Sequence, residues 1–305
     1  MRGMGAESLA FVDAKILNCS EPEYREHPGL SYSQWKYWDS PEFFEGAFVR
    51  KPPIYEIDET ADMLFGTNVH AEFLEGKECH QVPDWALTSD GKRYGKKWDA
   101  FKAGHPAIDC LSAKEIVTVQ GLRASIESQP KIANLLWGEG ESEVKIAALH
   151  NDTTIPVRGM LDKVRRTGTD YLIADMKVSA IDPCHRFGVS KRIWDFRYYM
   201  QAACYVDLAT AVYGKPPLDY LFVWCHKEPP YLVRAMPLEP AAIELGRRHN
   251  DEALKEISRR HFVGDWTGEG HNDVQETVID IPDWAYKAEQ PTFRDFIGDY
   301  QWAAK

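Results

Sequence analysis

The chain lacks the long apolar runs of a membrane protein and the apolar leader of a secreted one. No stretch of its 305 residues approaches the roughly 20 consecutive apolar residues that cross a bilayer. The N-terminal MRGMGAESLAFVDAK has no apolar core of the kind found in signal peptides. We therefore expect a cytoplasmic protein with no membrane partner.

Cysteine is also sparse, and its spacing carries no metal motif. The six cysteines form neither a C-x-x-C pair nor a cysteine–histidine zinc pattern. In a chain without a secretion signal, such residues are reduced thiols that mostly fill the core. The pattern argues against a structural zinc ion and an iron–sulfur cluster. The residues concerned are Cys19, Cys79, Cys110, Cys184, Cys204 and Cys225.

An excess of positive charge is absent as well. The formal net charge is −11, which argues against binding of nucleic acid over the whole surface. Local basic patches remain available to DNA, although a single patch is more often a solvated surface than a phosphate site. The candidates are Lys92, Arg93, Lys96 and Lys97; Arg165 and Arg166; and Lys191, Arg192 and Arg197.

The chain has the composition of a globular protein. It is 44% hydrophobic, 12% aromatic and 27% charged, without repeats or low-complexity tracts. Helical patterns occupy residues 28–137, strand patterns with one long helix occupy residues 142–240, and a helix with an acidic tail occupies residues 241–305. This order predicts a single α/β domain over residues 1–305, with a central mixed β-sheet flanked by helices.

Local signals place several elements. An S-x-x-Q capping box at Ser31 and Gln34 opens a short aromatic helix. Residues 77–106 show little periodicity, which is typical of a long loop region. Residues 112–137 predict a helix interrupted by a proline, and residues 195–213 predict one long helix.

A β-hairpin carrying charged residues is the most informative feature. Strand patterns at residues 155–166 and 171–179 flank Gly168-Thr169, which favours a two-residue turn with glycine first. In that register Asp162 faces Asp175, with Cβ atoms roughly 5 Å apart. Two carboxylates this close repel each other unless a cation or a proton lies between them. A divalent metal ion explains the pair most simply.

The plainer alternative is a solvated hairpin face. Asp175 and Lys177 point to the same side of the strand and could form an ordinary surface pair. However, the other residues of 171–178 are strongly apolar, which predicts burial on both faces. Buried charges require partners or metals. The pattern therefore favours a metal site.

The motifs around this hairpin resemble those of the PD-(D/E)XK nuclease superfamily, most closely its RecE branch, the exonuclease VIII type of phages and prophages. They are, in order, FGTNVHAEFLE, GMLDKV, IADMKVS and the Q-x-x-x-Y of YYMQAACY. LSYSQWKYWDSPEFF and IPDWA also resemble this branch, so the similarity runs from about residue 28 to about residue 285. Leu161 stands where the superfamily name would place a proline, as is common in this branch.

The resemblance implies a metal site and a catalytic lysine. His70, Asp162 and Asp175 would bind Mg²⁺, with Mn²⁺ as a substitute, and the backbone carbonyl of Met176 would be a further ligand. Lys177 would orient and help to deprotonate the attacking water. The chemistry is compatible, because Mg²⁺ prefers oxygen ligands and keeps several positions open to water or phosphate oxygens.

Other residues of the pattern have two interpretations each. His70 is a ligand or a core histidine beside an apolar stripe, and Glu75 supports the site or is a surface carboxylate. Gln201 and Tyr205 share a helix face, where they hydrogen-bond the lysine or a phosphate, or belong to the core. Gly159 permits close backbone approach or marks a bulge.

The activity implied by the resemblance is Mg²⁺-dependent hydrolysis of linear double-stranded DNA from 5′ to 3′, leaving single strands for recombination in a bacterial host cell. Expected partners are duplex ends, a phage-type single-strand annealing protein and further copies of the chain in a homo-oligomer. Two alternatives remain. One is a repair or restriction-like endonuclease of the same superfamily. The other is a non-catalytic DNA-end-binding module, against which intact Asp162, Asp175 and Lys177 argue.

Overall fold

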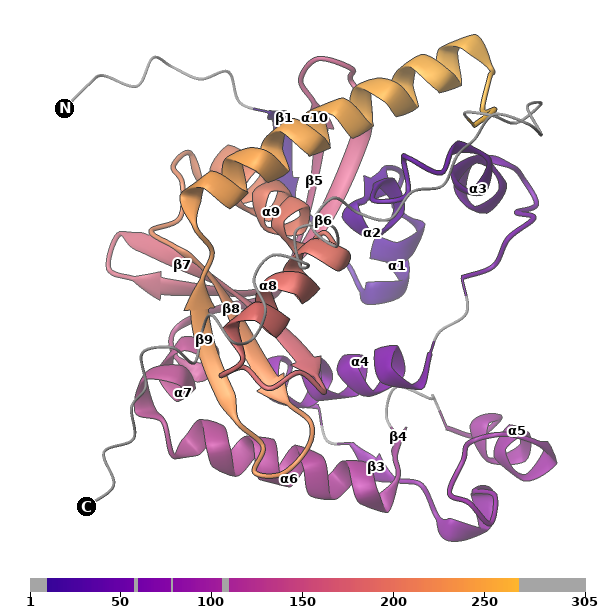
Figure 1. Ribbon diagram of the computed structural model, residues 1–305, viewed down its shortest axis with the longest axis vertical. Helices are drawn as coiled ribbons and strands as arrows, with labels where there is room; N and C mark the ends of the chain where they lie inside the picture. The colour runs from indigo at the N-terminus through magenta and orange to yellow at the C-terminus, as the bar shows by residue number, and fades with distance from the viewer. Residues whose placement is uncertain (1–9, 58–59, 78, 106–109, 269–305) are drawn as a thin grey trace, which may run out of the picture. The chain divides into compact units, whose positions relative to one another are not determined.

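A mixed β-sheet of seven strands forms the centre of the computed structural model, which describes residues 10–57, 60–77, 79–105 and 110–268 (Figure 1). Six strands follow the order β1-β5-β6-β7-β8-β9, and β2 pairs with β6. The pairs β7–β8 and β2–β6 are parallel, and the other neighbours are antiparallel. The strands are β1 (Phe11–Ile16), β2 (Leu30–Ser31), β5 (Gly140–His150), β6 (Pro156–Thr167), β7 (Asp170–Ser179), β8 (Tyr220–His226) and β9 (Val233–Pro237).

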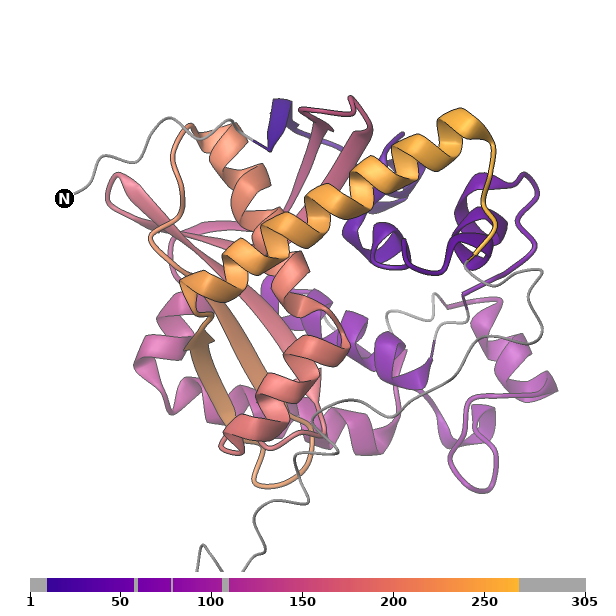
Figure 2. The same ribbon diagram turned by 45° about the horizontal axis from the view of Figure 1, so that its top comes forward.

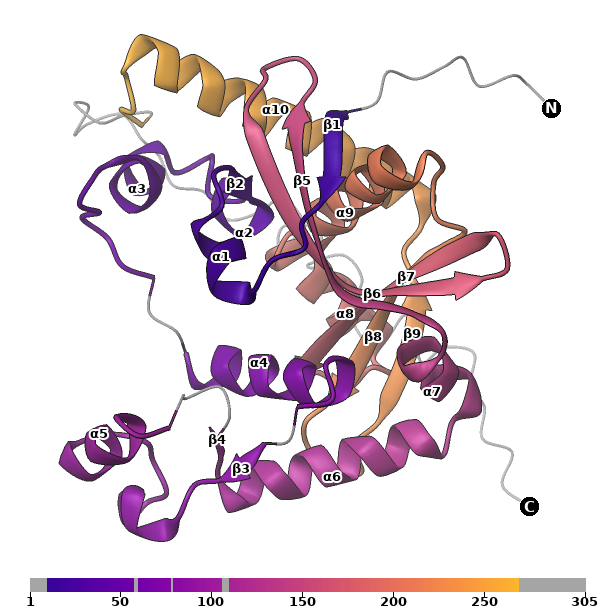
Figure 3. The same ribbon diagram turned by 180° about the vertical axis from the view of Figure 1, so that it is seen from behind.

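Helices cover both faces of this sheet, as the fold-class prediction requires. On one face α10 crosses over α9, which Figure 2 shows. On the other face lie α4, α6 and α7, seen from behind in Figure 3. The α-helices are α1 (Glu21–Glu26), α2 (Tyr32–Trp35), α3 (Pro41–Phe44), α4 (Ala61–Leu74), α5 (Lys96–Lys102), α6 (Ala113–Glu127), α7 (Pro130–Trp137), α8 (Arg186–Asp195), α9 (Tyr198–Tyr213) and α10 (Pro240–Val263), and a π-helical turn, η1 (Glu45–Val49), follows α3.

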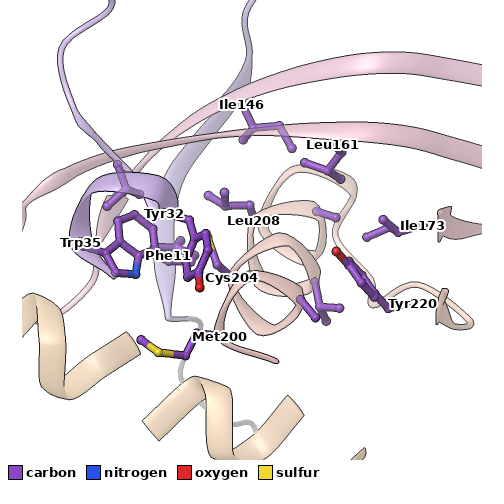
Figure 4. Packing of buried hydrophobic residues seen from close by; sticks show 14 of the residues in the cluster. Phe11, Tyr32, Trp35, Ile146, Leu161, Ile173, Met200, Cys204, Leu208 and Tyr220 are labelled. Atoms are coloured by element: carbon purple, nitrogen blue, oxygen red, sulfur yellow. The ribbon is translucent and has the colours of Figure 1, made fainter. Parts of the chain in front are cut away.

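The two faces of the sheet bury separate hydrophobic clusters. Tyr171 and Ile173 of β7 belong to the cluster against α9, part of which Figure 4 shows. Ala174 and Met176 of the same strand belong to the cluster that includes residues of α4 and α6. The predicted burial of this strand on both faces is therefore confirmed. A charged side chain such as that of Asp175 in β7 is consequently shielded from bulk water.

The N-terminal segment is attached to the core through a buried hydrogen bond. The predicted capping box is present, with Gln34 Oε1 accepting from the Ser31 backbone N–H at 2.8 Å. Trp35 in the same helix is fully buried, and its Nε1–H donates to Asn250 Oδ1 of α10 at 3.0 Å. Asn250 in turn donates to the backbone oxygen of Met200 in α9 at 2.9 Å. This chain of contacts joins three segments that are distant in the sequence.

Two predicted elements are corrected. Residues 77–106 are not a long loop: they contain β3 (His80–Gln81), η2 (Asp84–Ala86) and α5, and β3 pairs with β4 (Cys110–Leu111). Trp98 and Phe101 pack in a small core of their own, which shows no periodicity in the sequence.

The helix expected over residues 195–213 is confirmed as α9, but it begins three residues later than predicted, at Tyr198. Arg197 adopts a left-handed conformation with φ of +55° and separates α9 from α8, which the sequence analysis did not predict. The helix interrupted by a proline at residues 112–137 is confirmed as α6 and α7.

The chain divides into a unit of residues 1–266 and a second of residues 267–305. Residues 269–305, which include the IPDWA motif, lie outside the described residues. The single domain over residues 1–305 therefore stays a prediction. Among the described helices, none combines the length and the apolar character needed to cross a bilayer.

We expect Trp35→Phe to lower the free energy of unfolding by about 1–3 kcal/mol, because the buried Oδ1 of Asn250 loses its donor. Urea unfolding at pH 7 measures the change. Trp85→Phe, at a position that is 57% exposed, is the control and should change the free energy by less than about 0.5 kcal/mol. Equal losses in the two variants would contradict the role of the hydrogen bond.

Candidate metal centre

The hairpin of β6 and β7 has the register expected from its turn. The chain reverses at Gly168, where φ is +60°, and the backbone pairs continue up to Lys163 and Ala174. The next step in this register places Asp162 across from Asp175. The two carboxylates that motivated a metal site therefore come from neighbouring positions on adjacent strands.

A third carboxylate, which the sequence analysis missed, lies on the neighbouring strand β5. Glu143 lies across from Asp162, on the side opposite Asp175. Its φ of +52° is unusual for a residue other than glycine. Three acidic residues thus occupy one level of three adjacent strands. Only the pairing of β5 with β6 reveals this, because no local motif marks Glu143.

The ladder of backbone pairs is interrupted at this level, and side chains bind the free backbone groups. Asp162 Oδ2 accepts a hydrogen bond from the Met176 N–H at 2.8 Å. His70 Nε2, from α4, lies 3.0 Å from the carbonyl oxygen of Met176. Because a carbonyl only accepts, Nε2 carries the proton. In the neutral ring Nδ1 then has a free lone pair, and it lies 3.6 Å from Asp162 Oδ2.

Three of these groups form a compact set of donors to a metal ion. Ligand atoms of His70, Glu143 and Asp162 all lie within 4.8 Å of one another. The buried Oε1 of Glu143 has no hydrogen-bond partner among the described residues. Two carboxylates and one imidazole that converge in this way suit Mg²⁺ or Mn²⁺, which would take the place of the proton on Glu143.

Asp175 differs from the other two carboxylates because it contacts the lysine of the motif. It is fully buried, and its Oδ2 lies 2.6 Å from Lys177 Nζ. The lysine ammonium also lies 4.7 Å from the centre of the Tyr198 ring. The lysine side chain is only 13% exposed, so the interpretation of these two residues as a solvated surface pair is wrong.

Burial sets the charge states of the site. It raises the pKa of Glu143 to about 9, and the charge of Asp162 acts in the same direction. It also raises the pKa of Asp175 to about 6, although Lys177 opposes this shift. For Lys177, burial is the largest influence and lowers the pKa, but Asp175, Tyr198 and Asp162 together outweigh it, so the net direction is upward. The lysine is therefore an ammonium that can donate hydrogen bonds, which favours the orienting part of its predicted role.

Helix α9 approaches the site closely because β6 has no side chain at Gly159. A Cβ atom there would lie 2.6 Å from Leu208 Cδ1, so close approach is the better interpretation of this glycine. Burial raises the pKa of Tyr205 well above its usual value. A hydrogen bond with Gln201 lowers this pKa, and the charge of Asp175 raises it. Tyr205 therefore lies close enough to Asp175 for the two charges to interact, and the roles of Gln201 and Tyr205 stay predictions.

Glu75 is at the surface. It is exposed, and its Oε2 lies 3.0 Å from Lys77 Nζ. Its charge nevertheless contributes to the raised pKa of Glu143, after burial and Asp162. The contact pattern fits a surface carboxylate near the site, and a supporting role stays a prediction.

Several of the basic side chains predicted to bind DNA have partners within the chain. Arg165 donates to the backbone oxygens of Asn134 and Glu139, and Arg166 pairs with Glu141. Their role in DNA binding stays a prediction. The remaining candidates are Lys191 and Arg197, paired with Asp195 and Asp39; Arg192, over the ring of Phe196; and Lys96 and Lys97, exposed at the start of α5.

Comparison with known proteins agrees with this architecture. Residues 31–262 match the family described as a PDDEXK-like domain of unknown function. The chain belongs to this family and, with it, to the PD-(D/E)XK nuclease superfamily. Curated proteins give no match.

Two solved structures are similar to the chain. A crystal structure from Eubacterium rectale, described as a "Putative exonuclease", has a TM-score of 0.54 at 15% identity and covers 89% of this chain and 99% of its own. It shows the same fold. The structure of SSO0001 has a TM-score of 0.28 at 14% identity, and the match covers 65% of this chain and 87% of that one.

We expect the metal-free protein to lose stability as the pH rises from 5 to 9. The native state keeps a proton on Glu143 up to about pH 9, whereas the unfolded chain releases it near pH 4.5, so a rising pH favours unfolding. Glu143→Gln should flatten this dependence by at most about 1.4 kcal/mol per pH unit. Urea unfolding in EDTA at pH 5, 7 and 9 measures it. The exposed control Glu26→Gln should follow the wild type, and a parallel curve for Glu143→Gln would contradict the assignment.

Proposed function

We propose that the chain is a Mg²⁺-dependent exodeoxyribonuclease that hydrolyses linear double-stranded DNA from 5′ to 3′. The observation that carries this proposal is the convergence of Glu143, Asp162 and His70 beside the buried pair of Asp175 and Lys177. The superfamily supports a nuclease. The description of the Eubacterium rectale structure supports an exonuclease.

The donor set suits a divalent cation with open positions. The oxygens are hard ligands, and burial together with the charge of Asp162 raises the pKa values of Glu143 and Asp175, so additional positive charge would favour their ionised forms. A bound Mg²⁺ would supply that charge, polarise a phosphate oxygen and acidify a water molecule. The residues that would hold it are Asp162, Asp175, Glu143, His70 and the carbonyl of Met176.

Lys177 would act on the water and the phosphate rather than on the metal. Its ammonium is held by Asp175 at 2.6 Å and by the face of Tyr198. Held in this way, it can donate hydrogen bonds to an attacking water and to a phosphate oxygen, which orients both and stabilises the developing negative charge.

The two alternative functions, a DNA-end-binding module and an endonuclease, would use these side chains differently. A DNA-end-binding module gains nothing from buried carboxylates that repel both each other and DNA, so the cluster favours catalysis. An endonuclease of the same superfamily could use the same residues. The choice of an exonuclease therefore depends on the substrate test below.

The biological setting of the proposal follows from the resemblance. The single strands left by digestion would serve recombination in a phage or prophage context, with a single-strand annealing protein as partner. A homo-oligomeric ring, acidic outside and lined by basic residues, would reconcile a net charge of −11 with retention of DNA.

We expect Asp175→Asn to abolish cleavage while the fold and most of the DNA affinity remain. The substitution is nearly isosteric, and affinity depends mainly on basic contacts to many phosphates. Lys177→Ala should reduce the rate by at least about 100-fold. A nuclease assay in Mg²⁺ and a gel-shift titration in Ca²⁺ separate rate from binding. Asp90→Asn, at an exposed position, is the control, and wild-type cutting by Asp175→Asn would overturn the site.

Linear duplexes labelled separately at each 5′ and 3′ end test the reaction itself. We expect Mg²⁺-dependent loss of the 5′ label as small products, no reaction in EDTA, and no cutting of covalently closed circular DNA. Nicking of closed circles would favour the endonuclease alternative. Binding without hydrolysis of either substrate would favour the end-binding module.

A further inference from the structure

Helix α8, which the sequence analysis missed, carries an unusual number of exposed aromatic side chains. Six phenylalanine and tryptophan side chains are exposed among the described residues, and three of them lie in the ten residues from Phe187 to Phe196. Phe187 is 74% exposed and Trp194 is 59% exposed. Val189, on the opposite side of the helix, is buried, so these two aromatic residues do not belong to the core-facing side.

The exposed aromatic residues and a lysine share one face of α8. Phe187, Lys191 and Trp194 follow the spacing i, i+4 and i+7, which aligns them along one side of a helix. Lys191 pairs with Asp195 four residues on, an exposed contact of little energetic weight. We call the surface formed by Phe187, Lys191 and Trp194 the α8 face.

Positive charge gathers beside the α8 face although the chain is acidic overall. From Arg186 to Phe196 there are three basic side chains and one carboxylate, in a protein of net charge −11. Neither Arg186 nor Arg192 has a carboxylate partner among the described residues. The surface around the exposed rings therefore attracts anions.

Trp194 is held rigidly on its inner side and open on its outer side. Its ring stacks on Tyr199, with centroids 5.4 Å apart and planes inclined by 8°. The Tyr199 hydroxyl is hydrogen-bonded to His249 Nδ1 of α10 at 2.9 Å. An aromatic ring fixed in this way, with 59% of its residue surface exposed, can receive a second planar group on its free face.

The residue that follows α8, Phe196, is connected to Lys177 through aromatic contacts. Phe196 stacks on Tyr198 at 5.6 Å, and the ring of Tyr198 lies 4.7 Å from Lys177 Nζ. The intervening Arg197 is fixed, because its guanidinium pairs with Asp39 and its carbonyl accepts from the Tyr32 hydroxyl at 2.5 Å. The orientation of α8 relative to the candidate metal centre is therefore set by packed residues.

We propose that the α8 face binds a single strand of nucleic acid, with unpaired bases stacking on Trp194 and Phe187 and a phosphate contacting Lys191. The occupant is a single strand because stacking needs a free base face, which a duplex covers with neighbouring bases. Seven residues of helix separate the rings by roughly 10 Å, against about 3.4 Å between stacked bases, so they receive non-adjacent bases. The inference rests on the proposed nuclease function, since it assigns the strand that an exonuclease separates.

Binding in EDTA tests the inference without hydrolysis. Fluorescence anisotropy compares a labelled eight-nucleotide oligothymidine with an abasic strand of the same length, which has the same phosphates and no bases. We expect the wild type to bind the base-bearing strand roughly tenfold more tightly. Trp194→Leu should remove most of this preference, and Phe187→Leu part of it. The control Phe262→Leu, at a position that is 91% exposed on α10, should keep it.

A charge variant separates stacking from phosphate contact. Lys191→Gln should weaken binding of both strands by the same factor and lower the slope of log affinity against log salt by about 1. Equal affinity of the wild type for the two strands, or a preference that survives the combined Trp194→Leu and Phe187→Leu changes, would overturn the inference. A preserved base preference in a protein that cleaves no DNA would instead overturn the proposed function alone.

Discussion

Burial of negative charge in a sheet that is covered on both faces is the constraint around which the molecule is built. An unpaired carboxylate in such a place costs several kcal/mol, so each one needs a local solution. Glu143 keeps its proton, Asp162 accepts the Met176 N–H, and Asp175 pairs with Lys177. These solutions leave lone pairs unused, which is the condition in which a cation binds well.

The neighbouring helices α4 and α9 approach this cluster of carboxylates from the two faces of the sheet. The interruption of the backbone ladder exposes the N–H and the carbonyl of Met176, and α4 supplies His70 to the carbonyl. On the other face, Gly159 lets α9 approach β6 closely, so Tyr205 lies near the carboxylates. The positive φ of Glu143 fits the same picture, because strained backbone tends to accumulate where function and not stability is selected.

The charge distribution connects the centre to the surface. The candidate metal ligands are mostly acidic and would repel DNA. The junction of α8 and α9, in contrast, presents cations and aromatic rings, and Phe196 there stacks on Tyr198, whose ring contacts Lys177. Separating the two kinds of charge would let an acidic chain hold the proposed DNA substrate near a cluster of carboxylates. The attraction between the cations and DNA phosphates weakens as the salt concentration rises, whereas the stacking of bases on the rings depends little on salt. The two contributions to DNA affinity can therefore be measured separately.

The sequence by itself determined the hairpin and its register, because a two-residue turn and strand alternation are local rules that relate Asp162 to Asp175 without further information. His70 and the carbonyl of Met176 became candidate ligands only through the resemblance to a known superfamily. The sequence also indicated the sheet class and the helix of residues 112–137. Only the tertiary structure decided that Glu143 completes the site, since this depends on which strand pairs with β6. The break at Arg197 was hidden for a similar reason: its left-handed backbone is held by Asp39 and Tyr32, more than 150 positions away in the sequence. Contacts between residues so far apart follow no local periodicity, and only the folded chain brings them together.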